Sequence, residues 1–98
     1  MIRRDTIFID GKWVESAGDG TLTVINPATE EPIATVPRGN AVDVDRAAQA
    51  AAAAFTSWSQ TSVEERAAVL NRIARTLEAR SEELVRTIVS EVGQPIRM

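Results

Sequence analysis

The sequence predicts a small α+β fold in which two β-hairpins precede three α-helices. Two observations predict it. The first forty residues hold short β-branched runs that are separated by turn residues. After them, apolar residues recur at steps of three and four, which is the helical period. Ninety-eight residues allow one small domain, and 44% apolar with 26% charged residues are ordinary for a globular protein.

The first hairpin is predicted around Asp10-Gly11. Thr6–Ile9 and Lys12–Glu15 flank this pair as extended runs. A two-residue type I′ turn needs a positive φ at both central residues, and Asp-Gly meets that requirement. We therefore expect an antiparallel pair with a two-residue turn.

The loop after this hairpin contains Gly18 and Gly20, a lone G-x-G. A phosphate-binding loop would lead into a helix, whereas a strand pattern follows here. The sequence therefore predicts an ordinary loop of small residues at this place.

The second hairpin is predicted from the string VINPATEEPIATVP, which begins at Val24. Val24 and Ile25 enter as a β-branched pair. Pro27 then breaks the ladder, because proline has no N–H group to donate. A polar bend follows, and Pro32–Val36 returns as a strand.

The first helix is predicted directly after Asn40, a good N-cap residue. Asp43 and Asp45 lie in its first turn, where the helix dipole favours acids. Phe55 and Trp58 close its apolar stripe. These two aromatic side chains are compatible with a ligand platform, but core packing is the favoured interpretation.

A second and a third helix complete the predicted fold. Ser62 and Glu65 match a capping box at the start of the second helix. Arg80-Ser81 interrupts the pattern, and Gly93 ends the third helix. The apolar residues of the second helix occupy more than one stripe, and four short strands offer little sheet. The chain is therefore expected to pack against additional structure. The positions predicted to point inward on the third helix are Leu84, Val85, Ile88 and Val92.

The composition excludes several functional classes. The chain has no cysteine and no histidine, so disulfides, Cys/His zinc sites and Ser-His or Cys-His pairs are impossible. Net charge is −3 without a basic cluster, which argues against nucleic-acid binding. The longest apolar run, Ala50–Phe55, is far shorter than the ~20 residues that span a bilayer. We expect no membrane partner and a cytoplasmic location.

Five motifs in order resemble the N-terminal portion of the NAD(P)-dependent aldehyde dehydrogenase superfamily. The most specific is N-P-A-T-x-x-x-I-A-x-V-P in the second hairpin. The third helix ends in E-V-G-Q-P, similar to the family's E/D-x-G-K-P, with Gln94 where lysine is usual. The other matching segments are Phe8–Trp13, Asp43–Ala47 with Ala53–Phe55 and Trp58, and Glu65-Arg66 with Leu70 and Ile73.

This resemblance implies a family fold of the α/β class with a Rossmann-like cofactor domain. Residues 1–98 would be the N-terminal part of that domain, with hairpins over 5–39 and helices over 40–98. The complete enzyme would oxidise aldehydes to carboxylic acids with NAD or NADP, through a cysteine nucleophile. That cysteine and the cofactor-binding residues lie downstream in the family. No catalytic or cofactor-binding residue is therefore assigned here, and the 98-residue chain alone is expected to be inactive.

The family also implies a structural monovalent cation, K⁺ or Na⁺. Backbone carbonyls of Val24 and Ile25 and the carboxylate of Glu91 match its ligands in this region. The alternative is that Glu91 is a solvated acid at a helix end. The implied partners are the rest of the enzyme's own chain and further copies, in a homodimer or homotetramer.

A second hypothesis belongs to another functional class. The chain would be a free-standing interaction domain that binds a protein partner or a full-length homologue through an exposed sheet edge or helix stripe. The coding sequence beyond Met98 separates the two hypotheses.

Overall fold

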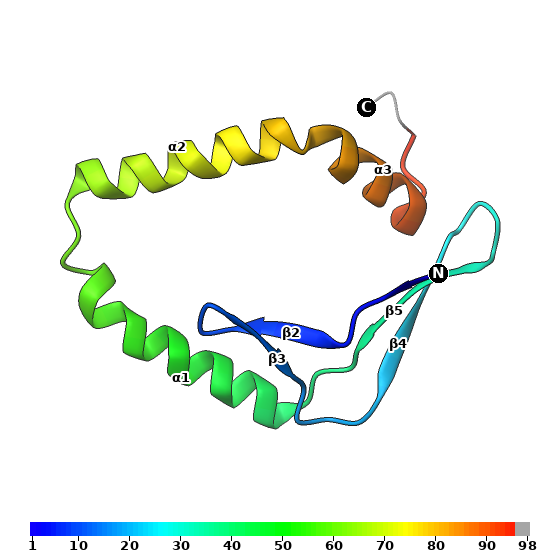
Figure 1. Ribbon diagram of the computed structural model, residues 1–98, viewed down its shortest axis with the longest axis horizontal. Coiled ribbons are helices and arrows are strands. Elements are labelled where there is room, and N and C mark those ends of the chain that lie inside the picture. The colour runs from blue at the N-terminus through cyan, green and yellow to red at the C-terminus, as the bar shows by residue number, and fades with distance from the viewer. Residues whose placement is uncertain (96–98) are drawn as a thin grey trace.

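The computed structural model describes residues 1–95, and its elements follow the predicted order (Figure 1). Three helices succeed the strands, so the predicted α+β arrangement is confirmed. One short strand at the N-terminus was not predicted. The elements are β1 (Ile2–Arg3), β2 (Thr6–Ile9), β3 (Lys12–Glu15), β4 (Thr21–Ile25), β5 (Pro32–Pro37), α1 (Ala41–Trp58), α2 (Val63–Ala79) and α3 (Ser81–Val92).

The first hairpin has the predicted register and turn. β2 and β3 are antiparallel, and Ile9 pairs with Lys12 across the turn. Asp10 has φ 56° and Gly11 has φ 72°, so both central residues adopt the positive φ of a type I′ turn. Phe8 and Trp13 lie opposite each other with ring centroids 5.2 Å apart in an edge-to-face arrangement.

The second hairpin belongs to a separate three-stranded sheet with the order β1-β5-β4. β4 begins at Thr21, three residues before the predicted entry. β1 runs parallel to β5, and the Arg4 N–H donates to the Thr35 carbonyl at 3.0 Å. The sequence signal for β1 is weak because two residues carry no pattern, so only its pairing with β5 defines it as a strand.

The turn of the second hairpin is stabilised by its own side chain. Asn26 Oδ1 accepts hydrogen bonds from the Ala28 and Thr29 N–H groups at 2.8 and 3.3 Å. Glu30 has φ 62°, an αL conformation that allows the chain to reverse. This local arrangement explains why the Asn-Pro-Ala-Thr string forms a turn.

The helix ends follow the predicted capping chemistry. Asn40 accepts from the Asp43 N–H, and the Asp43 side chain accepts from the Asn40 N–H, which completes a capping box. At α2, Ser62 Oγ accepts from the Glu65 N–H at 3.1 Å, which is the serine half of the predicted box. Gly93 ends α3 with φ 78°, as a left-handed C-cap.

The corner between α1 and α2 is held by Arg66. Its guanidinium donates to the backbone carbonyl of Ser59 at 3.1 Å and to Thr61 Oγ1 at 3.1 Å. The same group lies 6.0 Å from the ring centroid of Trp58, within the range of a cation–π contact. These contacts fix the direction in which α2 leaves α1.

The chain is open and thin. The three helices form an arc around the strands, with α1 on one side of them and α2 and α3 on the other (Figure 1), and the molecule measures 48 × 36 × 16 Å. Its radius of gyration is 17.1 Å, against about 13 Å for a compact domain of this length. Along residues 1–95 no helix is sufficiently long and apolar to cross a membrane.

The apolar side chains that were predicted to pack inward are not buried within the chain itself. No apolar side chain is buried among residues 1–95. Phe55 is 68% exposed and Trp58 47% exposed, although core packing was the favoured interpretation for both. The predicted inward residues of α3 are also exposed (Leu84, Val85, Ile88 and Val92). These side chains stay exposed because no other helix or sheet packs against the apolar faces of the helices.

Candidate functional site

The two predicted carbonyl ligands lie at an irregular end of β4. The β4–β5 ladder shifts register between Val24 and Ile25. Pro32 lies opposite Ile25 and has no N–H group to donate. The ladder is therefore irregular at the place where the two predicted carbonyl ligands lie.

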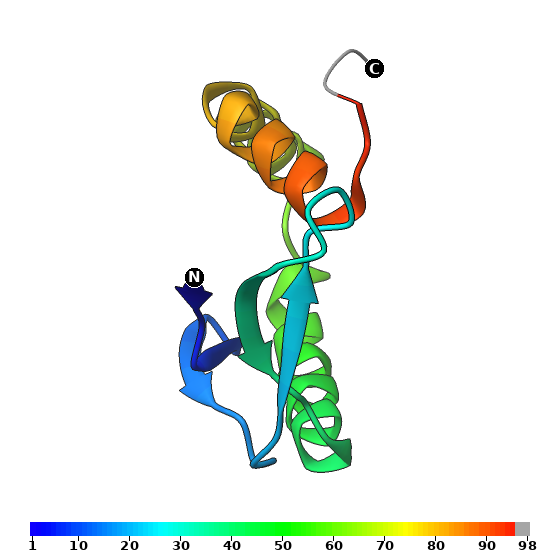
Figure 2. The same ribbon diagram turned by 90° about the vertical axis from the view of Figure 1, so that its right-hand side faces the viewer.

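The third predicted ligand, Glu91, lies in the last turn of α3. This helix end packs against the turn of the second hairpin: a Cβ atom added to Gly93 would lie 2.8 Å from Pro27 Cγ. Both views show the end of α3 beside the β4–β5 turn (Figures 1 and 2). The fold thus brings the last turn of α3 to the hairpin that carries Val24 and Ile25.

The chemistry of these groups suits a monovalent cation. Backbone carbonyls and one carboxylate are hard oxygen donors with a small total charge. Residues 1–95 contain no cluster of three or more His, Cys, Asp or Glu side chains suited to a metal ion. Such clusters of side chains hold most transition metals, whereas a site for a monovalent cation built from carbonyl groups does not need one.

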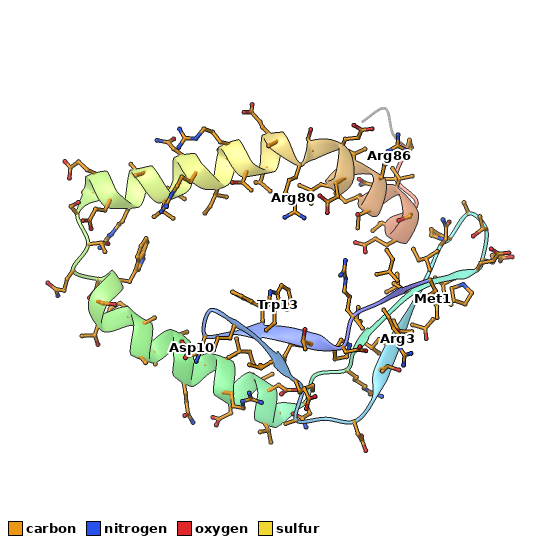
Figure 3. All side chains as sticks on the ribbon, in the orientation of Figure 1. Met1, Arg3, Asp10, Trp13, Arg80 and Arg86 are labelled. Atoms are coloured by element: carbon orange, nitrogen blue, oxygen red, sulfur yellow. The ribbon has the colours of Figure 1, made fainter. Side chains whose placement is uncertain are left out.

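A cavity of about 850 Å³ lies between the N-terminal strands and the α2–α3 junction. Trp13 projects into it from β3 and Arg80 from the junction (Figure 3). The Arg80 guanidinium is bidentate with Glu83, at 2.8 and 3.0 Å. Because Arg80 stabilises the charged form, the pKa of the Glu83 carboxyl is lowered from its ordinary value. Arg80 is therefore paired with Glu83 in the first turn of α3, at an exposed position.

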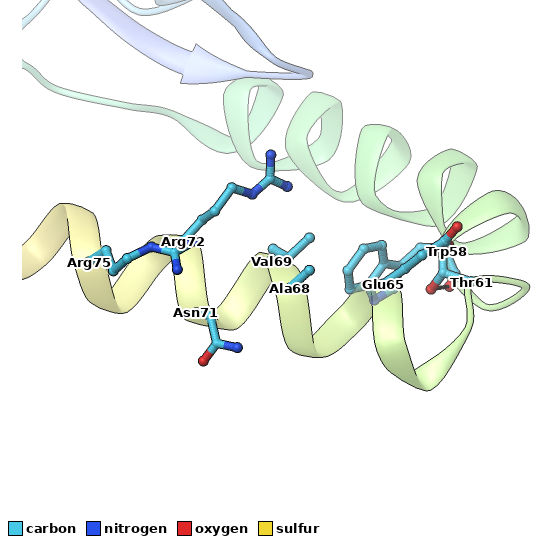
Figure 4. Close-up of a pocket in the computed structure, with 8 residues that line it drawn as sticks. All are labelled: Trp58, Thr61, Glu65, Ala68, Val69, Asn71, Arg72 and Arg75. Atoms are coloured by element: carbon cyan, nitrogen blue, oxygen red, sulfur yellow. Dashed lines mark hydrogen bonds between the residues drawn. The ribbon is translucent and has the colours of Figure 1, made fainter.

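A second groove, of about 730 Å³, follows the corner between α1 and α2 (Figure 4). The hydroxyl group in this groove belongs to Thr61, and it already donates a hydrogen bond to the Trp58 carbonyl at 2.7 Å. The groove carries no nucleophile paired with a base, so we interpret it as a surface against which other side chains could pack. Its lining residues are Trp58, Thr61, Glu65, Ala68, Val69, Asn71, Arg72 and Arg75.

The most constrained polar side chain was not predicted as such. Asp43 is 4% exposed, whereas sequence reasoning assigned it only to the helix dipole. Its carboxylate accepts from the Ala17 N–H and from Ser16 Oγ, which lie 26 and 27 residues away in the sequence. These donors lower the pKa of the Asp43 carboxyl, and Asn40 and Arg46 add to the effect. Only the Asn40–Asp43 part of this network has a sequence signal.

An open α+β arc whose apolar faces are uncovered is expected of a part of a larger protein, in which another layer buries those faces. The profile of the aldehyde dehydrogenase family matches residues 13–98. The chain belongs to the aldehyde dehydrogenase family.

Individual relatives support this family assignment. A Staphylococcus aureus protein described as an aldehyde dehydrogenase is 45% identical over 91 residues. An aldehyde dehydrogenase structure from Bartonella henselae superposes with TM-score 0.96 at 37% identity, over 100% of this chain and 21% of that one. One from Pseudomonas syringae, in complex with NAD⁺ and octanal, has TM-score 0.92 at 47% identity, over 94% and 19%.

The matched portion is a small part of those proteins. The alignment with the Staphylococcus aureus relative covers 93% of this chain and 19% of that protein. The chain therefore spans about a fifth of the length of the curated relatives that it matches.

Proposed function

We propose that this chain serves as the N-terminal structural portion of an NAD(P)-dependent aldehyde dehydrogenase, which oxidises aldehydes to carboxylic acids. Residues 1–98 would form the outer hairpins (5–39) and helices (40–98) of its cofactor-binding domain. Their role is architectural, since the chain has no cysteine to attack an aldehyde carbonyl.

One observation carries this proposal. The backbone of the whole chain superposes with TM-score 0.96 on a fifth of an aldehyde dehydrogenase, yet no apolar side chain among the described residues is buried. An arc that keeps this shape without a core needs a partner surface for its apolar faces. The rest of the same enzyme chain is that partner in our proposal.

The decisive experiment is to read the coding sequence past Met98. We expect a long open frame that contains a cysteine nucleophile. The purified 98-residue chain, mixed with NAD⁺ and an aldehyde, should show no reduction of the cofactor. A stop codon after Met98, or NAD⁺ reduction by the purified chain, would contradict the proposal.

The proposal extends to cofactor, assembly and location. The complete enzyme would bind NAD or NADP through residues outside this chain, and would form a homodimer or homotetramer in the cytoplasm. The NAD⁺ complex of the Pseudomonas syringae relative supports the choice of a nicotinamide cofactor. Activity with each cofactor, light scattering and cell fractionation test these three points separately.

We further propose that Val24, Ile25 and Glu91 contribute to a structural K⁺ or Na⁺ site in the complete enzyme. The interrupted ladder at Val24/Ile25 and the packing of the α3 end against Pro27 support it. Further oxygen ligands would come from outside residues 1–95.

The measurement is the thermal midpoint of the complete enzyme in KCl, NaCl and a bulky-cation salt at equal ionic strength. K⁺ or Na⁺ should raise the midpoint, and Glu91→Gln should remove that rise. Glu82→Gln, at an exposed position on the same helix, is the control and should keep it. Equal midpoints in all three salts would contradict the cation site.

The exposed apolar surface also favours a second candidate function, a free-standing interaction domain. Such a chain would bind a protein partner or a full-length homologue through the same faces. A stop codon directly after Met98, together with a stable complex between the chain and a full-length homologue, would favour this function.

A further inference from the structure

Both carboxylate oxygens of Asp43 are fully engaged. Oδ1 accepts from the Ala17 N–H at 2.8 Å and lies 3.6 Å from an Arg46 nitrogen. Oδ2 accepts from Ser16 Oγ and from the Asn40 N–H, the latter at 3.1 Å. One side chain therefore connects the loop after the first hairpin with the start of α1.

The backbones of the two loops also approach each other closely here. The Arg38 N–H donates to the Gly20 carbonyl at 2.9 Å. A Cβ atom on Gly18 would lie 3.0 Å from the Arg38 carbonyl oxygen, tighter than an ordinary contact. The G-x-G pattern does not match a phosphate-binding loop, but Gly18 allows this close approach of the two backbones.

Apolar packing of α1 against the strands is limited. The tip of the first hairpin and the alanine-rich side of α1 contact each other and line one open groove of about 340 Å³. Among the described residues no apolar side chain is fully buried between the two parts. Asp43 adds charge-assisted hydrogen bonds to this junction, and such bonds are stronger than those between neutral groups.

We propose that Asp43 is the structural joint that fixes the direction in which α1, and the helical arc behind it, leaves the strands. The joint acts through charge-assisted hydrogen bonds rather than through apolar packing. It is a property of this segment, and it holds whether the segment works inside a longer enzyme or as a separate domain.

The Asp43→Asn variant isolates this role. An amide of the same shape has one acceptor oxygen and one donor NH₂ group. In either orientation the NH₂ group faces one backbone N–H donor, that of Ala17 or that of Asn40, so at least one hydrogen bond is lost. Asp45→Asn is the matched control, because Asp45 lies in the same turn but is exposed and contacts only Gln49 by hydrogen bond, at 2.8 Å.

The test is amide hydrogen exchange of the 98-residue chain by NMR. In the parent, the Ala17 and Asn40 amides should be protected. Asp43→Asn should speed the exchange of at least one of these two amides by about tenfold or more, while Asp45→Asn should leave both unchanged. Equal rates in the two variants, or a parent Ala17 amide that exchanges at the free-peptide rate, would overturn the proposal.

A second variant covers a general loss of structure. If Asp43→Asn accelerates amide exchange in α2 as much as at Ala17, the variant has lost structure generally. The milder variant Ser16→Ala then tests the joint. The Ser16 hydroxyl donates to Asp43 and accepts from the Gly18 N–H at 3.1 Å. Faster exchange at Ala17, whose acceptor is Asp43 itself, with unchanged exchange in α2 supports the joint, and unchanged exchange at Ala17 overturns it.

Discussion

Gly93 at the end of α3 lies directly against the Pro27 ring in the turn of the second hairpin. A Cβ atom on Gly93 would be 2.8 Å from Pro27 Cγ, and its φ of 78° is one that L side chains rarely adopt. This contact joins the end of the helical arc to the turn of the second hairpin, more than sixty residues earlier in the sequence. It also brings α3 to the hairpin that carries two of the proposed cation ligands.

Gly93→Ala should therefore weaken the end of α3. The left-handed conformation alone costs about 1 kcal/mol for alanine, and the contact with Pro27 adds to it. We expect faster amide exchange in the last turn of α3. Gly20→Ala is the control, because a Cβ there would meet only Arg38 side-chain carbons at ordinary distance. Equal effects of the two substitutions would contradict the importance of this contact.

The Asp43 joint predicts a particular dependence on pH. Hydrogen bonds from Ala17, Ser16 and Asn40 and the charge of Arg46 hold the pKa of this carboxyl below its ordinary value. A lowered folded-state pKa contributes stability that is complete above the unfolded-state pKa and is lost as pH falls through the folded one. A ¹³C titration should show the Asp43 carboxyl to be more acidic in the folded chain than in the chain unfolded by denaturant. Coincident titration curves in the two states would argue against the joint.

Removing the N-cap of α2 should cause a local loss of helix. Ser62 Oγ satisfies the Glu65 N–H, which otherwise has no partner within the helix. Ser62→Ala should destabilise the start of α2 by about 1 kcal/mol, visible as lower helical content by circular dichroism. Ser90→Ala is the comparison, since that hydroxyl only donates to the Thr87 carbonyl at 2.9 Å within α3. A smaller effect at Ser62 than at Ser90 would contradict the cap.

The exposed apolar faces predict a difference between the isolated chain and the complete enzyme. Leu70 is 66% exposed on α2, so Leu70→Gln should change the stability of the 98-residue chain by less than about 0.5 kcal/mol. In the complete enzyme the same substitution would bury an amide and should cost about 2–4 kcal/mol. Denaturant unfolding of both proteins measures this. Equal small effects would mean that α2 stays exposed in the enzyme.

The isolated chain should also bind hydrophobic dyes. Apolar side chains on all three helices are open to solvent, among them Phe55, Leu77 and Val92. We expect strong fluorescence of an anilinonaphthalene dye with the 98-residue chain at neutral pH, and much weaker fluorescence with the complete enzyme. Equal fluorescence per mole would contradict the proposal that the rest of the enzyme covers these faces.

Sequence reasoning succeeded where the signal is local. The Asp10-Gly11 turn, the Asn40 and Ser62 caps and the Gly93 stop each depend on a few neighbouring residues, and all are present. Burial was predicted less well. The apolar period correctly identified helices, but a period tells which face is apolar and not what covers it.

The sequence by itself determined the family, the order of the elements and the chemistry of the turns and caps, because these depend on short motifs and backbone preferences. Only the tertiary structure decided that β1 joins β5, that Asp43 binds a loop 26 residues earlier, and that the end of α3 meets Pro27. Contacts between distant segments depend on how whole elements are arranged in space. No local pattern specifies that arrangement, and here it leaves the apolar faces open for a partner.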